Sequence, residues 1–173
     1  NLGNLLKELG KLKDAELSYR KAIEIKPDDA DAYSNLGVLL KELGKLKDAE
    51  LSYRKAIELK PDCEDAHSNL GVLLKELGKL KEAEISCRKA IEIKPDFAEC
   101  YYNLAGILKD LKKLDNAISY YDRASELGID FNLCLSGIGN VLLEQGHHAE
   151  GIKKLKAGQG AIQFNLKNGL TFN

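Results

Sequence analysis

The chain has 173 residues, and its 26 Lys and Arg residues nearly balance its 27 Asp and Glu residues, for a formal net charge of −1 at pH 7. This balance argues against a nucleic-acid-binding protein, which normally carries a basic excess, and no apolar run is long enough to span a bilayer. The four cysteines form no C-x-x-C pair. We therefore expect reduced thiols in a cytoplasmic protein, and neither a disulfide framework nor a zinc site.

A 34-residue repeat dominates the sequence. The stretch SNLGVLLKELGKLKDAELSYRKAIELKPD at 34–62 returns at 68–96 with four changes, and residues 1–28 form a further copy. Pro27, Pro61 and Pro95 mark the period. A fixed period of this length is typical of stacked supersecondary units, each of which needs its neighbours to bury its apolar face.

Each repeat should contain two helices joined by a glycine-containing turn. In the repeat at 30–63, Leu36 and Leu40 recur at helical spacing, and the first helix should end at Gly44 because glycine adopts the left-handed conformation without steric cost. The second helix should carry Ala49 on its apolar face and end before Pro61, because proline lacks the amide hydrogen that a continuing helix needs.

An aspartate follows the end of each second helix and should cap the first amides of the next helix. These predicted caps are Asp28, Asp62, Asp96 and Asp130.

The repeated residues resemble the tetratricopeptide repeat, a 34-residue helix–turn–helix unit, and in particular bacterial arrays of near-identical units. The resemblance implies an all-α fold, a right-handed α-solenoid of stacked helix pairs, in a protein that binds other proteins. In the repeat at 30–63, the signature residues are Tyr33, Leu36, Gly37, Ala49, Tyr53 and Pro61.

The array should span residues 1–158, divided into repeats at 1–29 (partial), 30–63, 64–97, 98–131 and 132–158. The fifth repeat is degenerate, since Gly151 and Gly158 replace small alanines and Leu155 replaces the aromatic residue. We expect it to be the least stable repeat, because each glycine weakens a helix by about 1 kcal/mol relative to alanine.

Residues 159–173 depart from the helical period. Ile162, Phe164 and Leu166 occupy alternate positions before Asn168-Gly169, and this pattern is typical of a short β-hairpin. One interpretation is an irregular cap over the last helix, and the other is the start of a following β-containing domain. The chain has no Met and begins inside a repeat, so we expect it to be a fragment, a processed product or only the ordered part of a longer chain.

The resemblance implies that the first helix of each repeat lines the concave side of the solenoid, through positions 2, 5, 6, 9, 12 and 13. Position 6 is an asparagine in four repeats: Asn1, Asn35, Asn69 and Asn103. A carboxamide both donates and accepts hydrogen bonds, so a column of them can bind the peptide groups of an extended chain whatever its sequence. The column resembles the asparagine ladder of the nucleocytoplasmic protein O-GlcNAc transferases.

Duplication alone would also repeat an asparagine, but Asn103 persists in the diverged fourth repeat, which favours ligand contact; Gly137 should end the ladder in the fifth. The other candidate peptide-binding residues at these positions are Asp31, Ser34, Val38, Lys41, Asp65, Ser68, Val72, Lys75, Tyr102 and Lys109.

The mixed charge of this groove favours a protein or peptide partner over nucleic acid. Tetratricopeptide co-chaperones hold a terminal carboxylate with lysine and arginine at positions 2, 5 and 6, where this chain has Asp, Ser and Asn. We do not expect that binding mode. The sequence also has no phosphate-binding loop and no nucleophile elbow, and His147 and His148 point apart on a turn. We therefore expect no enzymatic activity, no cofactor and no metal.

The sequence thus predicts a protein–protein interaction scaffold that binds a peptide segment of a partner in the concave groove. Two alternatives remain open. One is the substrate-recruiting N-terminal arm of a larger transferase or oxygenase, supported by the β-like tail and by bacterial arrays joined to such domains. The other is weak end-to-end self-association, because the ends of a solenoid expose seams that fit another copy.

Overall fold

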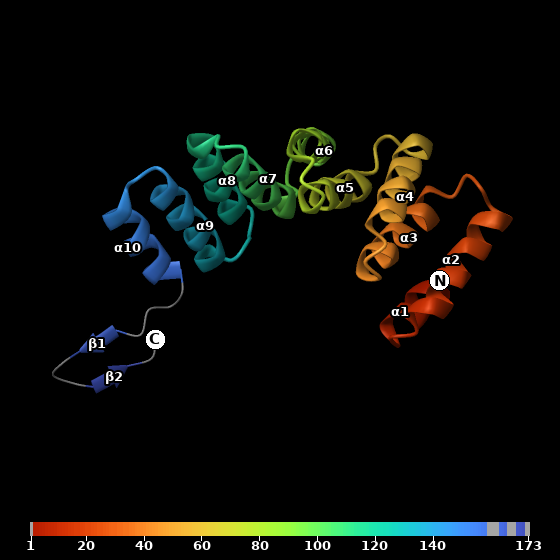
Figure 1. Ribbon diagram of the computed structural model, residues 1–173, viewed down its shortest axis with the longest axis horizontal. Helices are drawn as coiled ribbons and strands as arrows, with labels where there is room; N and C mark the ends of the chain where they lie inside the picture. The colour runs from red at the N-terminus through yellow and green to blue at the C-terminus, as the bar shows by residue number, and fades with distance from the viewer. Residues whose placement is uncertain (1, 159–162, 166–168, 172–173) are drawn as a thin grey trace. The chain divides into compact units, whose positions relative to one another are not determined.

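The computed structural model describes residues 2–158, 163–165 and 169–171 (Figure 1). The described part is almost entirely helical, which confirms the predicted all-α fold of successive helix–turn–helix repeats. None of its helices has the length and apolar character needed to cross a membrane. The helices are α1 Leu2–Glu8, α2 Leu12–Ile25, α3 Ala30–Glu42, α4 Leu46–Leu59, α5 Glu64–Glu76, α6 Leu80–Ile93, α7 Ala98–Asp110, α8 Leu114–Glu126, α9 Phe131–Glu144 and α10 His148–Gly158.

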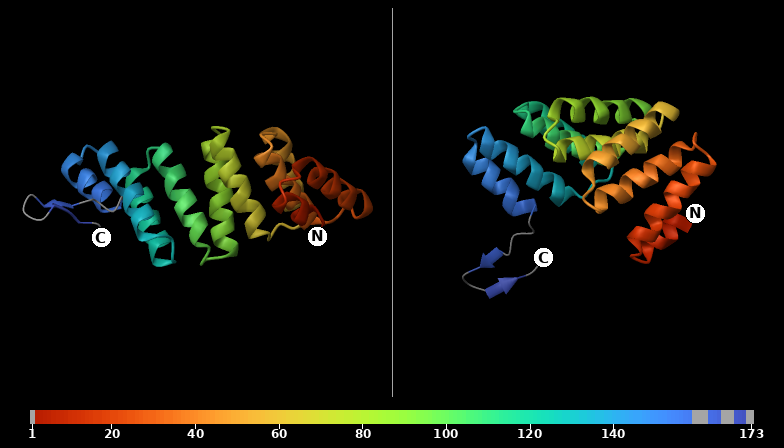
Figure 2. Two further views of the ribbon diagram at one scale, coloured as in Figure 1. Left: turned by 90° about the horizontal axis from the view of Figure 1, so that it is seen from below. Right: turned by 45° about the vertical axis from the view of Figure 1, so that its right-hand side comes forward.

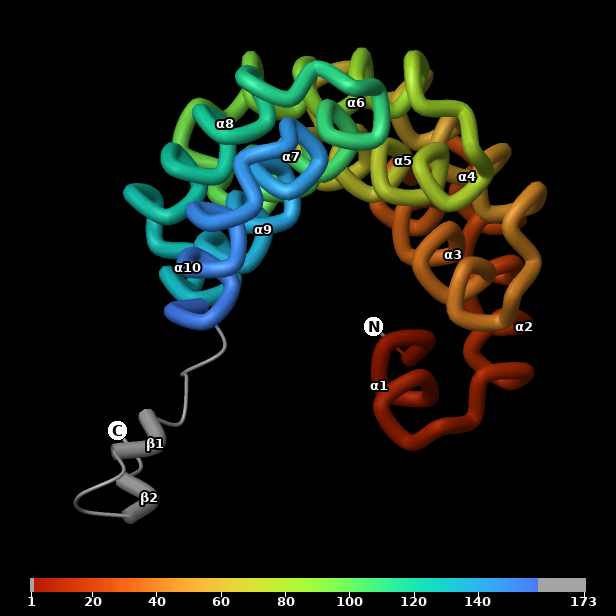
Figure 3. Tube along the Cα trace, turned by 60° about the vertical axis from the view of Figure 1, so that its left-hand side comes forward, coloured from red at the N-terminus to blue at the C-terminus, as the bar shows by residue number. Residues whose placement is uncertain are grey.

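The chain divides into two compact bodies, which we call the N-terminal body (Asn1–Pro95) and the C-terminal body (Asp96–Asn173). In the N-terminal body, the second helix of each pair packs on the first helix of the next pair, so α2 contacts α3 and α4 contacts α5 (Figure 2). Helix α3 also contacts α5 directly. In the C-terminal body, α7 pairs with α8, α9 pairs with α10, and α8 packs on α9 (Figure 3).

Glycines in the left-handed conformation end the first helices, as predicted. Gly10, Gly44 and Gly78 have φ values of 71°, 72° and 73°, and Gly146 has a φ of 85°. In the fourth repeat Lys112 occupies the same position and adopts a φ of 61°. A side chain is disfavoured in this conformation, so the fourth repeat carries local backbone strain that the other turns avoid.

The predicted helix caps are wrong at Asp28, Asp62 and Asp96. Each of these residues lies within the turn that follows the proline, and the next residue is the N-cap: Asp29, Cys63 and Phe97. Asp130 does cap α9, by accepting a hydrogen bond of 2.8 Å from the Leu133 amide. Asp130 occupies the N-cap because α8 ends at Glu126, the turn passes through Gly128 (φ 106°), and α9 begins one residue earlier in the repeat than the other first helices.

Small residues let the two helices of a pair approach closely. Ala49 and Ala56 are fully buried, and a Cβ atom added to Gly37 would lie 2.7 Å from Cε1 of the Tyr53 ring. Gly71 packs in the same way against Cys87, which replaces the tyrosine in the third repeat. All four cysteines are buried, Cys87 among them as predicted, and none takes part in a disulfide in the described residues.

Two short strands follow the helices. Strand β1 (Gln163–Asn165) pairs antiparallel with β2 (Gly169–Thr171), with Phe164 opposite Leu170. This pairing agrees with the predicted hairpin. Ile162, Leu166 and Asn168, which also belong to that prediction, lie outside the described residues.

Candidate peptide-binding face

The candidate peptide-binding face consists of repeat positions 2, 5, 6, 9, 12 and 13 on the first helices of the helix pairs. Asn35 on α3 and Asn69 on α5 occupy the same position of two helices that contact each other, and both side chains are half-buried. Asn103 is half-buried on α7 of the C-terminal body. Asn1 lies outside the described residues. The N-terminal body therefore contains two neighbouring members of the predicted column.

The other predicted residues of α3 and α5 differ in accessibility. Asp31 and Asp65 are exposed at the start of each helix, while Val38 and Val72 are half-buried beside the asparagine positions. Ser34 is half-buried, but Ser68 is only 4% exposed. The face therefore presents carboxylates, asparagines and short aliphatic side chains, while Ser68 is almost inaccessible.

Of the predicted lysines, Lys41 is held by a carboxylate of the next repeat, since its Nζ lies 2.7 Å from Glu76 Oε1. Lys7, at the same position of the first repeat, pairs with Glu42 in the same way at 2.8 Å. Lys109 Nζ lies 3.7 Å from Oδ1 of the adjacent Asp110. The sequence indicated Lys41 but not its partner, because Glu76 is one repeat away in the chain. These pairs neutralise much of the charge on the face, so binding here should depend mainly on hydrogen bonds and small apolar contacts.

Tyr53 lies beneath the face, with its ring against Gly37. Burial, together with the nearby carboxylates of Glu42 and Glu76, raises the pKa of the Tyr53 hydroxyl far above its usual value. The phenol is therefore protonated at neutral pH and forms an uncharged part of the core.

The C-terminal body has an aromatic residue in place of the small Ser34 and Ser68. Tyr102 stands edge-on to Tyr121 with ring centroids 5.3 Å apart, and burial raises its pKa. A Cβ atom on Gly137 would lie 2.6 Å from the Tyr121 ring. Gly137, which stands where the predicted asparagine column ends, therefore makes room for the Tyr121 ring. The replacement of asparagine by glycine was the only sequence signal for that contact.

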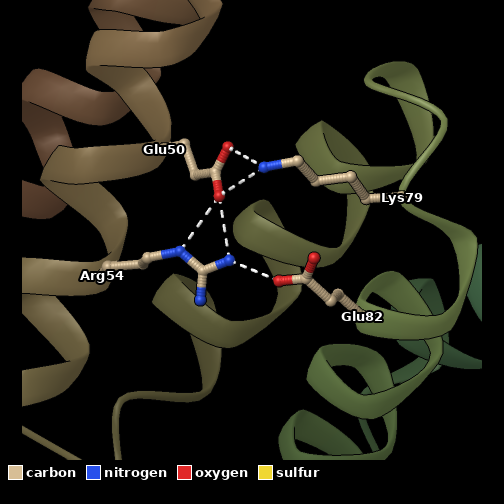
Figure 4. A network of polar contacts seen from close by, with 4 residues as sticks. All are labelled: Glu50, Arg54, Lys79 and Glu82. Atoms are coloured by element: carbon tan, nitrogen blue, oxygen red, sulfur yellow. Dashed lines mark hydrogen bonds and ion pairs between the residues drawn. The ribbon is translucent and has the colours of Figure 1, made fainter.

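The second helices carry a different polar network, which the sequence did not reveal (Figure 4). Glu50 on α4 accepts hydrogen bonds from Arg54, one turn along the same helix, and from Lys79 in the next repeat. Arg54 also reaches Glu82 on α6, at 2.6 Å. The hydrogen bond from Lys79 is the main cause that lowers the pKa of Glu50. These contacts join neighbouring repeats and offer no reactive group.

Two equivalent grooves of about 440 Å³ lie between successive repeats of the N-terminal body. Their floors are aliphatic, with Leu36 in the first groove and Leu70 in the second, and Leu51 and Ile85 stand at the edges with 68% and 69% exposure. These grooves were not predicted from the sequence, although an aliphatic residue recurs in the middle of each of these second helices, at Leu51 and Ile85. Within the described residues, no group of three His, Cys, Asp or Glu side chains is placed to hold a metal ion.

Family comparisons agree with the helix pairs. A family model described as "TPR repeat" matches residues 3–44, and models described as "Tetratricopeptide repeat" match residues 30–63, 64–97 and 98–127. No curated protein sequence matches the chain.

Several solved structures share the fold. MamA is 22% identical with a TM-score of 0.84, over 92% of this chain and 93% of that one. YrrB, described as a TPR protein with an unusual peptide-binding site, is 23% identical with a TM-score of 0.79, over 91% and 81% of the two chains. PilF from Pseudomonas aeruginosa is 23% identical with a TM-score of 0.80, over 96% and 76%. The repeat motif, the helix pairs and these matches together show that the chain belongs to the tetratricopeptide repeat family.

Proposed function

We propose that the chain is a protein–protein interaction scaffold that binds an extended peptide segment of a partner along the candidate peptide-binding face. The observation that carries this proposal is the placement of Asn35 and Asn69, half-buried and in the same register on contacting helices. YrrB, which has a similar fold, is described as having a peptide-binding site, and this description supports the same class of ligand here.

The chemistry of a carboxamide suits a peptide of any sequence. Each asparagine offers a carbonyl oxygen to a peptide N–H and an amide N–H to a peptide C=O. The exposed edges of Val38 and Val72 supply apolar contacts beside the asparagines. We propose the same role for Asn1 and for Asn103, with Tyr102 and Lys109 beside the latter. The lysine–glutamate pairs then limit the electrostatic preference of the face for either charge.

The test uses a peptide that is selected from a random library on the wild-type chain. The variant Asn35→Ala, Asn69→Ala, Asn103→Ala removes three side chains that each contribute about 0.5–1.5 kcal/mol as a net hydrogen bond. We expect the dissociation constant of the selected peptide to rise by about 10-fold or more, measured by fluorescence anisotropy.

The matched control is Asn116→Ala, since Asn116 is exposed on the second helix α8. This control should bind as tightly as the wild type. A triple variant that keeps the wild-type circular dichroism spectrum and the wild-type affinity contradicts the proposal.

We further propose that this scaffold acts in the cytoplasm, without a cofactor and without catalysis of its own. The proposal rests on a candidate site built from amides, ion pairs and aliphatic side chains, which bind and orient a ligand but supply no nucleophile or base. A substrate-recruiting arm would use the same binding chemistry, so the asparagine test applies to either role.

A further inference from the structure

The grooves along the second helices of the N-terminal body form a surface that the asparagine face does not use. The first groove lies between α2 and α4 and the second between α4 and α6, one repeat apart. Leu51 at the edge of the first groove and Ile85 at the edge of the second are 68% and 69% exposed. Exposed aliphatic side chains at a hollow are typical of a surface that binds another molecule.

A small residue keeps each groove open. Ser52 lines the first groove, and Ser86 lines the second at the same repeat position. The Ser52 hydroxyl donates a hydrogen bond of 2.9 Å to the carbonyl oxygen of Asp48 in its own helix, so it needs no ligand. Tyr33 borders the first groove and His67 borders the second. Each groove therefore has a side-chain ring in one wall and free space beside it.

The fourth repeat shows what fits beside such a ring. Its residue at the serine position is Tyr120, and its residue at the position of Tyr33 and His67 is Tyr101. The rings of Tyr101 and Tyr120 pack against each other, with centroids 5.9 Å apart and planes inclined by 32°. The chain itself thus fills this place with an aromatic side chain.

The neighbouring residue of the second helix changes together with the serine. Leu51 and Ile85 each precede a serine, whereas Ser119 precedes Tyr120. The fourth repeat, which supplies its own ring, therefore has no exposed aliphatic residue at this edge. The second and third repeats have the apolar edge and the space but supply no ring.

The lysines at the rims do not define the occupant, because carboxylates of the chain already pair with them. Lys55 Nζ lies 2.7 Å from Glu58 Oε1, and Lys89 Nζ lies 2.9 Å from Glu92 Oε1. An anionic ligand would have to displace a carboxylate from each lysine. The grooves therefore favour apolar contact over charge.

We propose that the two grooves bind aromatic side chains, phenylalanine or tyrosine, of a partner protein. The bound ring takes the place that Tyr120 fills in the fourth repeat. It packs against Tyr33 in the first groove and against the His67 imidazole in the second, and the exposed aliphatic residue covers its edge. Ring pairs at such a separation gain more than their buried area alone provides. This surface is separate from the asparagine face, so the inference does not rest on the proposed function.

The first test uses p-cresol, the side chain of tyrosine, as a probe on the full chain with labelled methyl groups. We expect saturable NMR shifts of the Leu36 and Leu51 methyls in the first groove and of the Leu70 and Ile85 methyls in the second. The saturated analogue of p-cresol should bind about three-fold or more weakly, because it cannot form a ring pair. Equal binding of the two probes, or shifts that do not saturate, overturns the proposal.

The residue pair of the fourth repeat can then be used to close one groove at a time. The variant Leu51→Ser, Ser52→Tyr supplies a ring to the first groove. The variant Ile85→Ser, Ser86→Tyr does the same in the second. Each variant should lose the p-cresol shifts of its own groove and keep those of the other, which is the control for folding within the same molecule. A closed groove that still responds in a folded variant contradicts the proposal.

A peptide library tests the partner class separately from the asparagine face. The library is selected on the variant Asn35→Ala, Asn69→Ala, Asn103→Ala, and the selected peptides should be enriched in phenylalanine and tyrosine. They should lose their affinity when both grooves are closed in that variant. Selected peptides without aromatic residues, or with unchanged affinity for the closed grooves, show that the assigned partner is wrong.

Discussion

Single residues decide where the helices of this chain begin and end, and Lys112 is the clearest case. It adopts a positive φ of 61° at the turn where the other repeats place glycine. Substitution by glycine removes the clash between the side chain and the backbone, which costs roughly 1–2 kcal/mol in this conformation. We therefore expect Lys112→Gly to raise the free energy of unfolding by about 1 kcal/mol in urea denaturation.

Lys112 also pairs with Glu144 at 2.7 Å, and Lys112→Ala separates the two effects. The alanine variant loses the exposed ion pair but keeps the strained backbone, so it should be no more stable than the wild type. A glycine variant that is less stable than the alanine variant would contradict the explanation by strain.

The pH dependence of stability should reflect Glu50. The hydrogen bond from Lys79 lowers the pKa of Glu50 in the folded chain. The folded state therefore binds fewer protons at this carboxyl than the unfolded state does. Its contribution to stability is complete above the unfolded pKa of about 4.3 and is lost as the pH falls through the lower folded value.

We expect the wild type to lose more unfolding free energy than Glu50→Gln when the pH is lowered from 6 to 3. Glu24→Gln is the control, because Glu24 is exposed and forms no ion pair in the described part of the chain. The control should follow the wild-type profile. Parallel profiles for the wild type and Glu50→Gln would show that the Lys79 contact does not form in solution.

At the scale of helices, α9 and α10 approach each other more closely than alanine would allow. A Cβ atom on Gly151 would lie 2.9 Å from the Gly139 carbonyl oxygen, and one on Gly139 would lie 2.9 Å from the Gly151 carbonyl oxygen. From the sequence alone, Gly151 is only a weak point of helix α10. The facing glycine on α9 gives it a second role that helix propensity does not express.

Gly151→Ala should therefore destabilise the chain by roughly 1–3 kcal/mol, as overpacked sites do. Helix propensity alone predicts the opposite sign, a gain of about 1 kcal/mol. Thermal unfolding distinguishes the two, with Lys153→Ala as the control because Lys153 is exposed on the same helix. A more stable Gly151→Ala variant would show that the two backbones are not in contact.

The helices themselves were predictable because the repeat fixes their spacing, and the glycines and prolines fix their ends. The caps were not, because Asp28 and Asp29 are adjacent and only the turn geometry decides which of them starts α3. On the candidate face, position in the repeat indicated Asn35 and Asn69 as candidate peptide-binding residues. It could not show that Ser68 is buried or that Lys41 binds Glu76, because both depend on how one repeat packs against the next.

Across the whole molecule, the repeats of the two bodies differ in the residues that they place on the candidate face. The N-terminal body carries the near-identical repeats, with serine at position 5 of its candidate face, whereas the C-terminal body places Tyr102 there against Tyr121. We propose that amides bind a peptide backbone in one body and that an aromatic side chain adds selectivity in the other.

We propose that a peptide binds on the side of the N-terminal body that carries Asn35 and Asn69. The most direct measurement is the two-dimensional NMR spectrum of the side-chain amides during titration with the library-selected peptide. We expect the Asn35 and Asn69 carboxamide signals to shift and saturate together, while the Asn116 signal stays fixed. Saturable binding of the peptide with the Asn35 and Asn69 carboxamide signals unchanged would contradict this proposal.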